Sequence, residues 1–253
     1  MIVATPAAFV AALKACTAAI ALQGTFPVLA VGPNPCPVQI DASGATVAAW
    51  TLYGSKHVTI VGGTVGKGVY FDTLIYGADD ITIDGGYYPA AKNAAISVYN
   101  STNVTVRRVV MRNSEGDCFD ASGSRHVLVE DSTCTDHAPG SPGLHPDAFA
   151  IWSPANLPQT TDVTIRRNTV IGNFQGVTGF DHPSQGQKGF ARITFSDNRI
   201  ATDEPQCVAL YDATDSVVTG NVCSTLFGAK FQPSINVVGG NVIQSGNTPG
   251  LRP

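Results

Sequence analysis

The chain has 253 residues and a net charge of −4, with only 13% charged residues but 26 glycines and 16 prolines. This composition is typical of one large domain in which tight turns join many short strands, and it does not favour helices with charged outer faces. The acidic balance argues against a nucleic-acid partner, and no apolar run approaches the roughly 18 residues that a membrane span needs.

The chain begins with an Ala-rich segment, residues 1–22, that we expect to form an amphipathic helix. Thr5 suits the N-cap, Pro6 suits the first helical position, and apolar residues follow on one face: Phe9, Leu13, Cys16 and Ile20. The segment lacks the basic start of a secretory signal, so we expect any signal peptide to have been removed. The repeat that follows leaves an open end with exposed strand edges, and we assign this helix to the cap of that end.

A strand-like apolar triplet then recurs at a fixed step. Its first four copies begin at Val58, Ile81, Val104 and Val127, and the three steps between them are equal. Later copies begin at Val163, Ile193 and Val217, so the steps become 36, 30 and then 24. A regular period of about 23 residues marks a solenoid, in which each repeat buries its apolar face against its neighbours. The steps of 36 and 30 carry 13 and 7 extra residues, and they identify the segments that the fold does not require.

Each period has room for three short strands, which predicts the coils of a parallel β-helix over residues 36–245. In one coil we expect these strands at 104–106, 109–112 and 118–122. We expect a single domain over residues 1–253, with residues 1–22 as its cap. An asparagine begins the second strand of several late coils, where stacked amides can hydrogen-bond along the solenoid: Asn168, Asn198, Asn221 and Asn241.

The period, the turn asparagines and the capping helix together resemble the right-handed parallel β-helix proteins of the pectin lyase-like superfamily. The resemblance covers nearly the whole chain and implies an all-β, right-handed parallel β-helix with three strands in each coil. The superfamily includes polysaccharide lyases, glycoside hydrolases, uronate epimerases, phage tailspike depolymerases and non-catalytic adhesins. The fold therefore leaves the reaction open.

Six cysteines form three pairs that are local in sequence: Cys16 with Cys36, Cys118 with Cys134, and Cys207 with Cys223. Residues about one coil apart lie on adjacent coils of a solenoid, so each pair is expected within disulfide range. Three disulfides would indicate an oxidising compartment, and we expect a secreted or periplasmic protein. The alternative is six buried thiols that pack as small apolar side chains.

The five histidines separate into two groups. His57 and His126 occupy the same point of the repeat, which indicates a structural role. His137, His145 and His182 lie in or beside the segments that break the period, and each has an aspartate nearby. Acids and imidazoles gathered where the fold does not need them indicate a functional site.

Asp117 and Asp147 begin the same Asp-x-Phe motif in consecutive coils. Their carboxylates should stack about 5 Å apart, and repulsion at that distance favours a shared proton or a bound cation. The same spacing suits the carboxylate pair of a retaining glycosidase. With Asp120, which we expect to point outward on the same side, they are candidate ligands for Ca²⁺. The alternative is that both aspartates cap turns through local hydrogen bonds.

Aromatic side chains should lie beside these acids. Alternation along the third strand sends Trp152 outward, and Phe180 and Tyr211 occupy the same row in the next coils. Such rings suit the apolar face of a sugar, although Trp152 is equally suited to packing beneath the loop that follows it. We expect Asp181 and His137 to contact the substrate as well.

The segment 145–152 looks like a His-x-Asp-x-x-Gln stretch of many bacterial β-helix proteins, with Ala150 at the Gln position. The function that we rank first is a polyuronate-type polysaccharide lyase that acts by base-catalysed β-elimination. We expect no cofactor other than Ca²⁺. The candidate catalytic groups besides the two aspartates are His145, His182, Lys188 and Tyr211. The alternatives are a glycoside hydrolase that uses Asp117 with Asp147, or Asp147 with Asp181, and a non-catalytic glycan-binding solenoid. The expected partner in each case is a polysaccharide or oligosaccharide.

Overall fold

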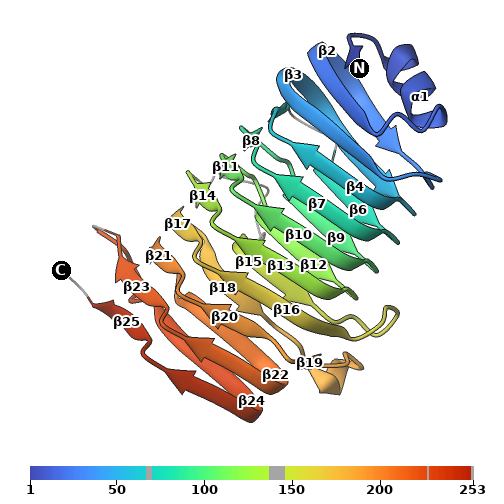
Figure 1. Cartoon of the computed structure of the whole chain (residues 1–253). Helices are drawn as coiled ribbons and strands as arrows, with labels where there is room; N and C mark the ends of the chain where they lie inside the picture. The colour runs from blue at the N-terminus through green and yellow to red at the C-terminus, as the bar shows by residue number, and fades with distance from the viewer. Residues whose placement is uncertain (67–69, 137–145, 227, 252–253) are drawn as a thin grey trace.

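The computed structural model describes residues 1–251 except 67–69, 137–145 and 227, and it confirms the predicted all-β parallel solenoid (Figure 1). Every pairing between the described strands is parallel, and each strand pairs with its equivalent in the next coil. A coil contains a first, a second and a third strand on its three sides, as the repeat predicts.

The elements follow this three-strand order along the chain. The N-terminal end holds β1 (Ile2–Val3), helix α1 (Pro6–Lys14), β2 (Ala19–Val31) and β3 (Val38–Tyr53). The first strands are β4 (Lys56–Val61), β7 (Asp79–Asp84), β10 (Thr102–Arg107), β13 (Arg125–Glu130), β16 (Thr160–Arg166), β19 (Phe190–Ala191) and β20 (Thr194–Ser196). The second strands are β5 (Thr64–Val65), β8 (Tyr87–Tyr88), β11 (Val110–Arg112), β14 (Thr133–Thr135), β17 (Thr169–Gly172) and β21 (Arg199–Thr202). The third strands are β6 (Phe71–Tyr76), β9 (Ala94–Tyr99), β12 (Asp117–Ser122), β15 (Asp147–Trp152) and β18 (Gln175–Gly179). The C-terminal coils contain β22 (Gln206–Thr219), β23 (Val222–Thr225), β24 (Ser234–Ser245) and β25 (Thr248–Leu251), and a 3-10 turn spans Pro183–Gln185.

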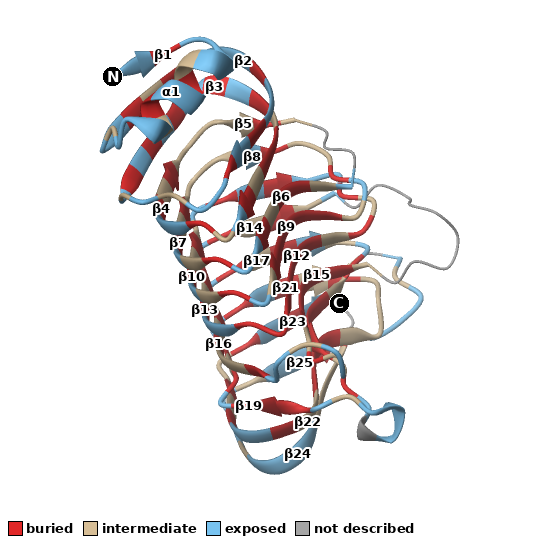
Figure 2. Ribbon diagram, turned by 90° about the vertical axis from the view of Figure 1, so that its right-hand side faces the viewer, coloured by how far each residue is buried: buried red, intermediate tan, exposed pale blue. Residues whose placement is uncertain are grey.

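The core is a set of apolar columns inside the coils (Figure 2). Val58, Ile81, Val104, Val127 and Val163 are aligned across successive first strands and are all buried. The predicted triplets therefore mark one inward column. Because every coil buries its inward residues against the coils on either side, the regular sequence period becomes a continuous core.

The last predicted step of the repeat is wrong by one residue. Thr194 and not Ile193 pairs with Val217, so this step equals the regular one, and the period returns after the two breaks. The reason is that Val217 is apolar although it lies on the outer face, whereas its two neighbours in the strand, Ser216 and Val218, are buried. The apolar pattern alone assigned Val217 to the inward side.

The extra residues lie at two corners of the coil, on either side of the third strands. Phe119 pairs with Phe149, a step of 30, so seven of the 13 extra residues precede β15. The other six follow β15, because the first strands pair Val127 with Val163, a step of 36. The loop between β18 and β19 lies at this second corner in the next coil. The two loops there are hydrogen-bonded: the Lys188 N–H donates to the Ser153 carbonyl at 3.1 Å.

The N-terminal helix is a cap, as predicted, but it is shorter than the segment 1–22. The Thr5 side chain accepts a hydrogen bond from the Ala8 N–H, and the helix ends at Lys14. Phe9 is buried, with its ring 6.1 Å from that of Trp50. Ile20 belongs to β2 and not to the helix, because β2 already pairs with β3 along its length. The coils thus begin at Ala19, earlier than the predicted residue 36.

The three predicted disulfides are present: Cys16–Cys36, Cys118–Cys134 and Cys207–Cys223. Such a set is typical of proteins that fold in an oxidising compartment. No helix in the described part of the chain has the length and apolar character needed to cross a membrane.

A ladder of buried asparagines supports one corner of the late coils. Asn198 Oδ1 accepts from the Asn168 backbone N–H at 3.0 Å, and Asn221 Oδ1 accepts from the Asn198 amide at 2.9 Å. The next member is Asn247, whose Oδ1 accepts from the Asn221 N–H. The prediction of Asn241 as that member is wrong. Asn241 lies at a different turn, where its amide donates to Asp215.

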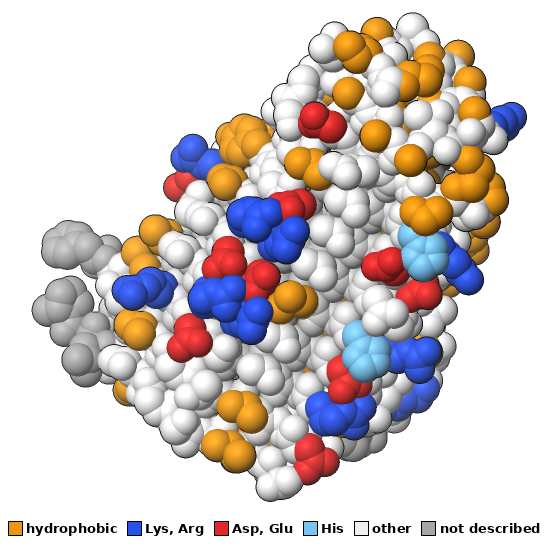
Figure 3. Space-filling view, in the orientation of Figure 1, with side chains coloured by type: hydrophobic (Ala, Val, Ile, Leu, Met, Phe, Trp, Pro, Cys, Tyr) orange, Lys and Arg blue, Asp and Glu red, His pale blue; other side chains and the backbone are white. Residues whose placement is uncertain are grey.

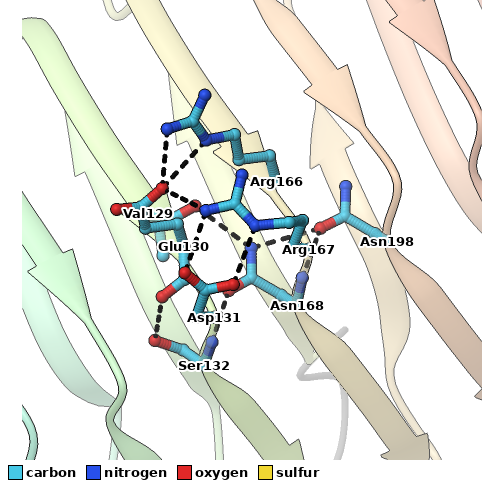
Figure 4. A network of polar contacts seen from close by, with 8 residues as sticks. All are labelled: Val129, Glu130, Asp131, Ser132, Arg166, Arg167, Asn168 and Asn198. Carbon is cyan, nitrogen blue, oxygen red and sulfur yellow. Dashed lines mark hydrogen bonds and ion pairs between the residues drawn. The ribbon is translucent and has the colours of Figure 1, made fainter.

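We call the outer face of β4, β7, β10, β13, β16 and β20 the first-strand face. Among the described residues, most ion pairs lie on this face or at its edges, and Figure 3 shows acidic and basic side chains side by side there. Arg166 and Arg167 both contact Glu130, and Arg167 also contacts Asp131 (Figure 4). The hydrogen bond from Arg167 lowers the pKa of Asp131. His57 and His126 occupy the same left-handed turn, with φ of 53° and 54°, which supports their structural interpretation.

Candidate functional site

Asp117 and Asp147 are the first residues of β12 and β15, which are neighbours on the third side of the coil. Because Phe119 pairs with Phe149, the two aspartates lie one coil apart, as the motif predicts. The Asp147 N–H donates to Asp117 Oδ1 at 2.9 Å. The Asp117 carboxylate therefore lies against the backbone of the next coil, close to the second carboxylate.

These acids lie in surroundings that disfavour negative charge. Burial raises the pKa of Asp117 well above its ordinary value, and the neighbouring charges of Asp147 and Asp120 raise it further. Burial also raises the pKa of Asp147. Burial raises the pKa of Asp120 to about 7, even though the Ser97 hydroxyl donates to it at 2.9 Å. Burial therefore favours the protonated form of each carboxyl group, and the stacked charges disfavour ionisation of Asp117 and Asp147 together. A pair that shares one proton in this way contains a candidate general acid and an ionised partner.

Several buried oxygens of this region have no hydrogen-bond partner. Within the described residues, these atoms include Asp120 Oδ1, Asp147 Oδ1 and Gln175 Oε1. Buried polar atoms in proteins are almost always hydrogen-bonded, and an unpaired one costs about 1–3 kcal/mol. Because Asp147 and Gln175 are paired across β15 and β18, two of these atoms come from adjacent positions. A ligand with hydroxyl groups could supply the missing donors.

A hollow of about 440 Å³ opens beside Asp147. Its described lining combines one carboxyl group, one imidazole, two aromatic rings and three amides: Asp147, His182, Trp152, Phe180, Gln175, Gln185 and Gln187. None of these lining residues is a lysine or an arginine. Aromatic rings with amides and a carboxyl group match the apolar face and the hydroxyl groups of a sugar.

The three aromatic side chains predicted beside the acids do lie next to one another. The ring centroids of Trp152 and Phe180 lie 6.5 Å apart, and those of Phe180 and Tyr211 lie 5.3 Å apart. Trp152 is only partly buried and borders the hollow. The Trp152 ring therefore has exposed surface for a ligand. Tyr211, in the coil that follows, packs against the Phe180 ring.

We call the loop that follows β15 and the loop between β18 and β19 the corner loops. Two predicted site residues belong to the second of these loops and contact the first. Asp181 is fully buried, and its carboxylate accepts from the Ser153 N–H at 3.3 Å and from the Gly189 N–H at 2.6 Å. It ties the two loops together, and the predicted substrate contact does not fit this position. The Lys188 ammonium donates to the Leu157 carbonyl, and Lys188 is not among the lining residues of the hollow.

Three further predictions have different outcomes. Asp120 lies on the outward side of its strand, as expected, but its side chain is buried, with only 4% exposed. Ser97 of the preceding coil holds one of its oxygens. His137 and His145 lie outside the described residues.

Calcium binding stays a prediction. In residues 1–251 without the three gaps, no three His, Cys, Asp or Glu side chains surround a common point that could hold a metal ion. Asp117, Asp120 and Asp147 are neighbours, but the described geometry does not arrange them as a ligand shell. No chemical step below uses a cation.

Four residues of this region are not among those predicted from the sequence: Gln175, Tyr99, Gln185 and Gln187. Gln175 occupies in its coil the position that Asp117 and Asp147 occupy in theirs, so the repeat alone could have identified it. Tyr99 is on β9, which pairs with the strand β12 that carries Asp117 and Asp120, and burial and these carboxylates raise its pKa. The amides of Gln185 and Gln187 belong to a loop without a pattern that would indicate their direction.

A second hollow, of about 490 Å³, lies at the C-terminal end of the solenoid. Its described lining contains no acidic or basic side chain: Gln232, Pro233, Ser234, Ile235, Gln244, Asn247 and Pro249. It offers no group for acid–base chemistry, so the region of Asp117 and Asp147 is the candidate site.

Comparisons with known proteins agree with this architecture. The sequence matches a family model described as a right handed beta helix region over residues 48–224. No curated protein sequence matches the chain. A tailspike protein mutant of the E. coli bacteriophage HK620, in complex with a pentasaccharide, has a TM-score of 0.57 and 11% identity, and the match covers 94% of this chain and 53% of the tailspike.

Two other solved structures are similar with lower TM-scores. An alginate lyase from a Paenibacillus species has a TM-score of 0.46 and 15% identity over 95% of this chain and 98% of the lyase. PfbA, a surface adhesin of Streptococcus pneumoniae, has a TM-score of 0.47 and 12% identity over 97% of this chain and 88% of the adhesin. At such identities the likeness concerns the fold alone, and the chain spans about half the length of the tailspike.

Proposed function

The chain belongs to the right-handed β-helix family, and from this premise we propose that it binds a polysaccharide and cleaves it by hydrolysis, with Asp117 and Asp147 as the catalytic pair. The observation that carries this proposal is the stacking of the two carboxyl groups on adjacent coils, with the pKa of each raised by burial. The hollow beside Asp147 supports it, because aromatic rings and amides lie there to hold a sugar.

The pair can perform two complementary tasks. In the first step, a protonated carboxyl group donates its proton to the glycosidic oxygen as that bond breaks, and the ionised partner attacks the anomeric carbon to form a glycosyl ester. In the second step, the first group, now ionised, takes a proton from a water molecule that attacks the anomeric carbon and breaks the ester, which restores both carboxyl groups. Strand spacing of about 4.8 Å is close to the separation in retaining glycosidases, so we propose net retention of configuration. Asp147, which borders the hollow, is the better candidate for the acid, and Asp117 for the partner.

The second candidate is β-elimination, which the sequence alone ranks first. It is favoured by His182, an imidazole in the lining of the same hollow that could remove the proton beside a uronate carboxylate. It is weakened by the position of Lys188 and by the lack of a described cationic lining residue to neutralise that carboxylate. Hydrolysis needs only the two aspartates.

Further observations support a cellular compartment and a class of ligand for the proposed activity. The three disulfides favour a secreted or periplasmic protein. A tailspike of the same fold was solved with a pentasaccharide, which supports carbohydrate as the ligand class. We propose a polysaccharide or oligosaccharide as the partner.

The test is a screen of neutral and acidic polysaccharides, with and without a chelator, that records reducing ends and ultraviolet absorbance together. New reducing ends without absorbance would support hydrolysis. Reducing ends with the absorbance of an unsaturated uronate would establish elimination and overturn the leading proposal. Loss of activity with the chelator would support the predicted Ca²⁺, and binding without any product would contradict both reactions.

A further inference from the structure

The outward row that holds Trp152 extends along the third strands, one coil after another, far beyond the candidate site. Strand register aligns one residue from each coil: Tyr53, Tyr76, Tyr99, Ser122 and Trp152. Phe180 and Tyr211 continue this row through ring contacts. We call these seven residues the aromatic row. Six of the seven are aromatic, and Ser122 alone interrupts them.

The fold does not require this row. The equivalent outward row on the first-strand face consists mainly of threonine, the ordinary choice for a solvent-facing strand position: Thr59, Thr82, Thr105, Leu128, Thr164 and Thr194. The core is filled from the other side of the same strands, where Leu52, Ile75 and Val98 are fully buried. The tyrosines therefore serve something outside the core.

The N-terminal part of the aromatic row is open to solvent. Tyr53 is 58% exposed and Tyr76 is 37% exposed. Their rings are parallel, with centroids 5.1 Å apart, so they form a stacked pair. A stacked pair of rings with hydroxyl groups at the edge offers apolar area and hydrogen bonds together, which is the combination that a sugar surface needs.

The aromatic row is continuous with the site. Tyr99 lies on β9, between Tyr76 on β6 and the strand β12 that carries Asp117 and Asp120. Beyond Ser122, Trp152 and Phe180 line the hollow beside Asp147. The row follows the solenoid axis, and coils repeat about every 4.8 Å, similar to the advance of one sugar unit in an extended chain.

We propose that the aromatic row is the binding track for one extended glycan chain that runs parallel to the solenoid axis, with Tyr53 and Tyr76 as a remote binding platform two to three coils from the acids. This inference rests on the proposed function. It specifies a polymer substrate whose distant units contribute affinity, and it excludes a mono- or disaccharide as the main ligand.

The test compares a double variant, Tyr53→Ala with Tyr76→Ala, against Tyr87→Ala. Tyr87 is 39% exposed on β8, away from the aromatic row, and thus controls for loss of an exposed tyrosine. Both are made in an Asp147→Asn background, which prevents turnover. The probes are an octasaccharide and a disaccharide prepared from the polysaccharide that the screen identifies, and the measurement is calorimetric titration with circular dichroism as the folding check.

We expect the double variant to bind the octasaccharide roughly tenfold more weakly, because it loses two ring contacts with the distant sugar units. Disaccharide affinity should stay unchanged, and Tyr87→Ala should match its background for both probes. Unchanged octasaccharide affinity, or an equal loss for both probes, would overturn the inference while leaving the proposed hydrolysis intact. If the natural chain binds and cleaves none of the glycans, the proposed function fails first, and the inference fails with it.

Discussion

The first-strand face and the third-strand side of the solenoid use the same acidic residue types in opposite ways. On the first-strand face, hydrogen bonds from arginine lower the pKa of Asp131 and, to about 2, that of Asp162. On the third-strand side, burial raises the pKa of Asp117, Asp120 and Asp147. Two of these three also keep an oxygen without a described partner.

The difference separates structural charge from reactive charge. A carboxylate paired with arginine is fixed in its ionised form and has no proton to give near neutral pH. A buried carboxyl group that lacks a cation holds its proton in that range and costs stability. The third-strand side therefore carries chemistry that the solenoid does not need, and the following substitutions test this contrast.

The largest expected effect is that of Asp147→Asn. We expect activity toward the identified polysaccharide to fall by about 10³-fold with the fold intact, because the variant has no proton to donate. The matched control is Asp131→Asn on the first-strand face, which should stay within twofold of the natural chain. Initial rates and circular dichroism measure both, and comparable rates for the two variants would remove the proposed distinction.

A large structural effect is expected from Asn198→Ala. This change removes the acceptor of the Asn168 N–H and the donor to the Ile165 carbonyl, both within the buried ladder. We expect the free energy of unfolding to fall by about 2–4 kcal/mol. Urea unfolding measures this loss. An effect below about 1 kcal/mol would mean that the ladder is not a main support of the late coils.

An increase in the free energy of unfolding at neutral pH is expected for Asp120→Asn. The folded pKa of Asp120 is raised to about 7, so its stabilising contribution is complete at low pH and is lost as the pH rises from about 4 to about 7. The amide cannot ionise, and we expect the variant to be more stable than the natural chain at pH 7.5, by up to about 4 kcal/mol, with no gain at pH 4. Urea unfolding at the two pH values measures the difference; a destabilised variant at pH 7.5 would show that the charged form is favoured.

The smallest effect is expected from Arg167→Ala, because exposed ion pairs add little stability. The midpoint of thermal unfolding should fall by no more than about 3 °C at low salt, and by less at high salt. Since Arg167 lowers the pKa of Asp131, its contribution exists above the ordinary Asp pKa and vanishes as the pH falls through the lowered one. A salt-independent loss, measured by calorimetry, would contradict this interpretation of the first-strand face.

The repeat made much of the fold predictable. Val58 and its equivalents, Thr5 at the helix start, the three cysteine pairs and the stacking of Asp117 on Asp147 all follow from local pattern and a fixed period. The register predicted from the period is wrong at Val217, because this residue is apolar but faces outward. The assignment of Asn241 to the asparagine ladder is wrong because two turns of the late coils both begin with an asparagine.

The candidate site was predictable in position and less so in detail. The solenoid, its columns and the coils that carry the acids follow from the sequence alone, because a strand register repeats the same geometry in every coil. The contacts of Asp181 and Lys188 with the corner loops, and the positions of Gln175 and Tyr99 beside the acids, were visible only in the folded chain. Those outcomes depend on contacts between loops of different coils and on burial, which the repeat period does not encode.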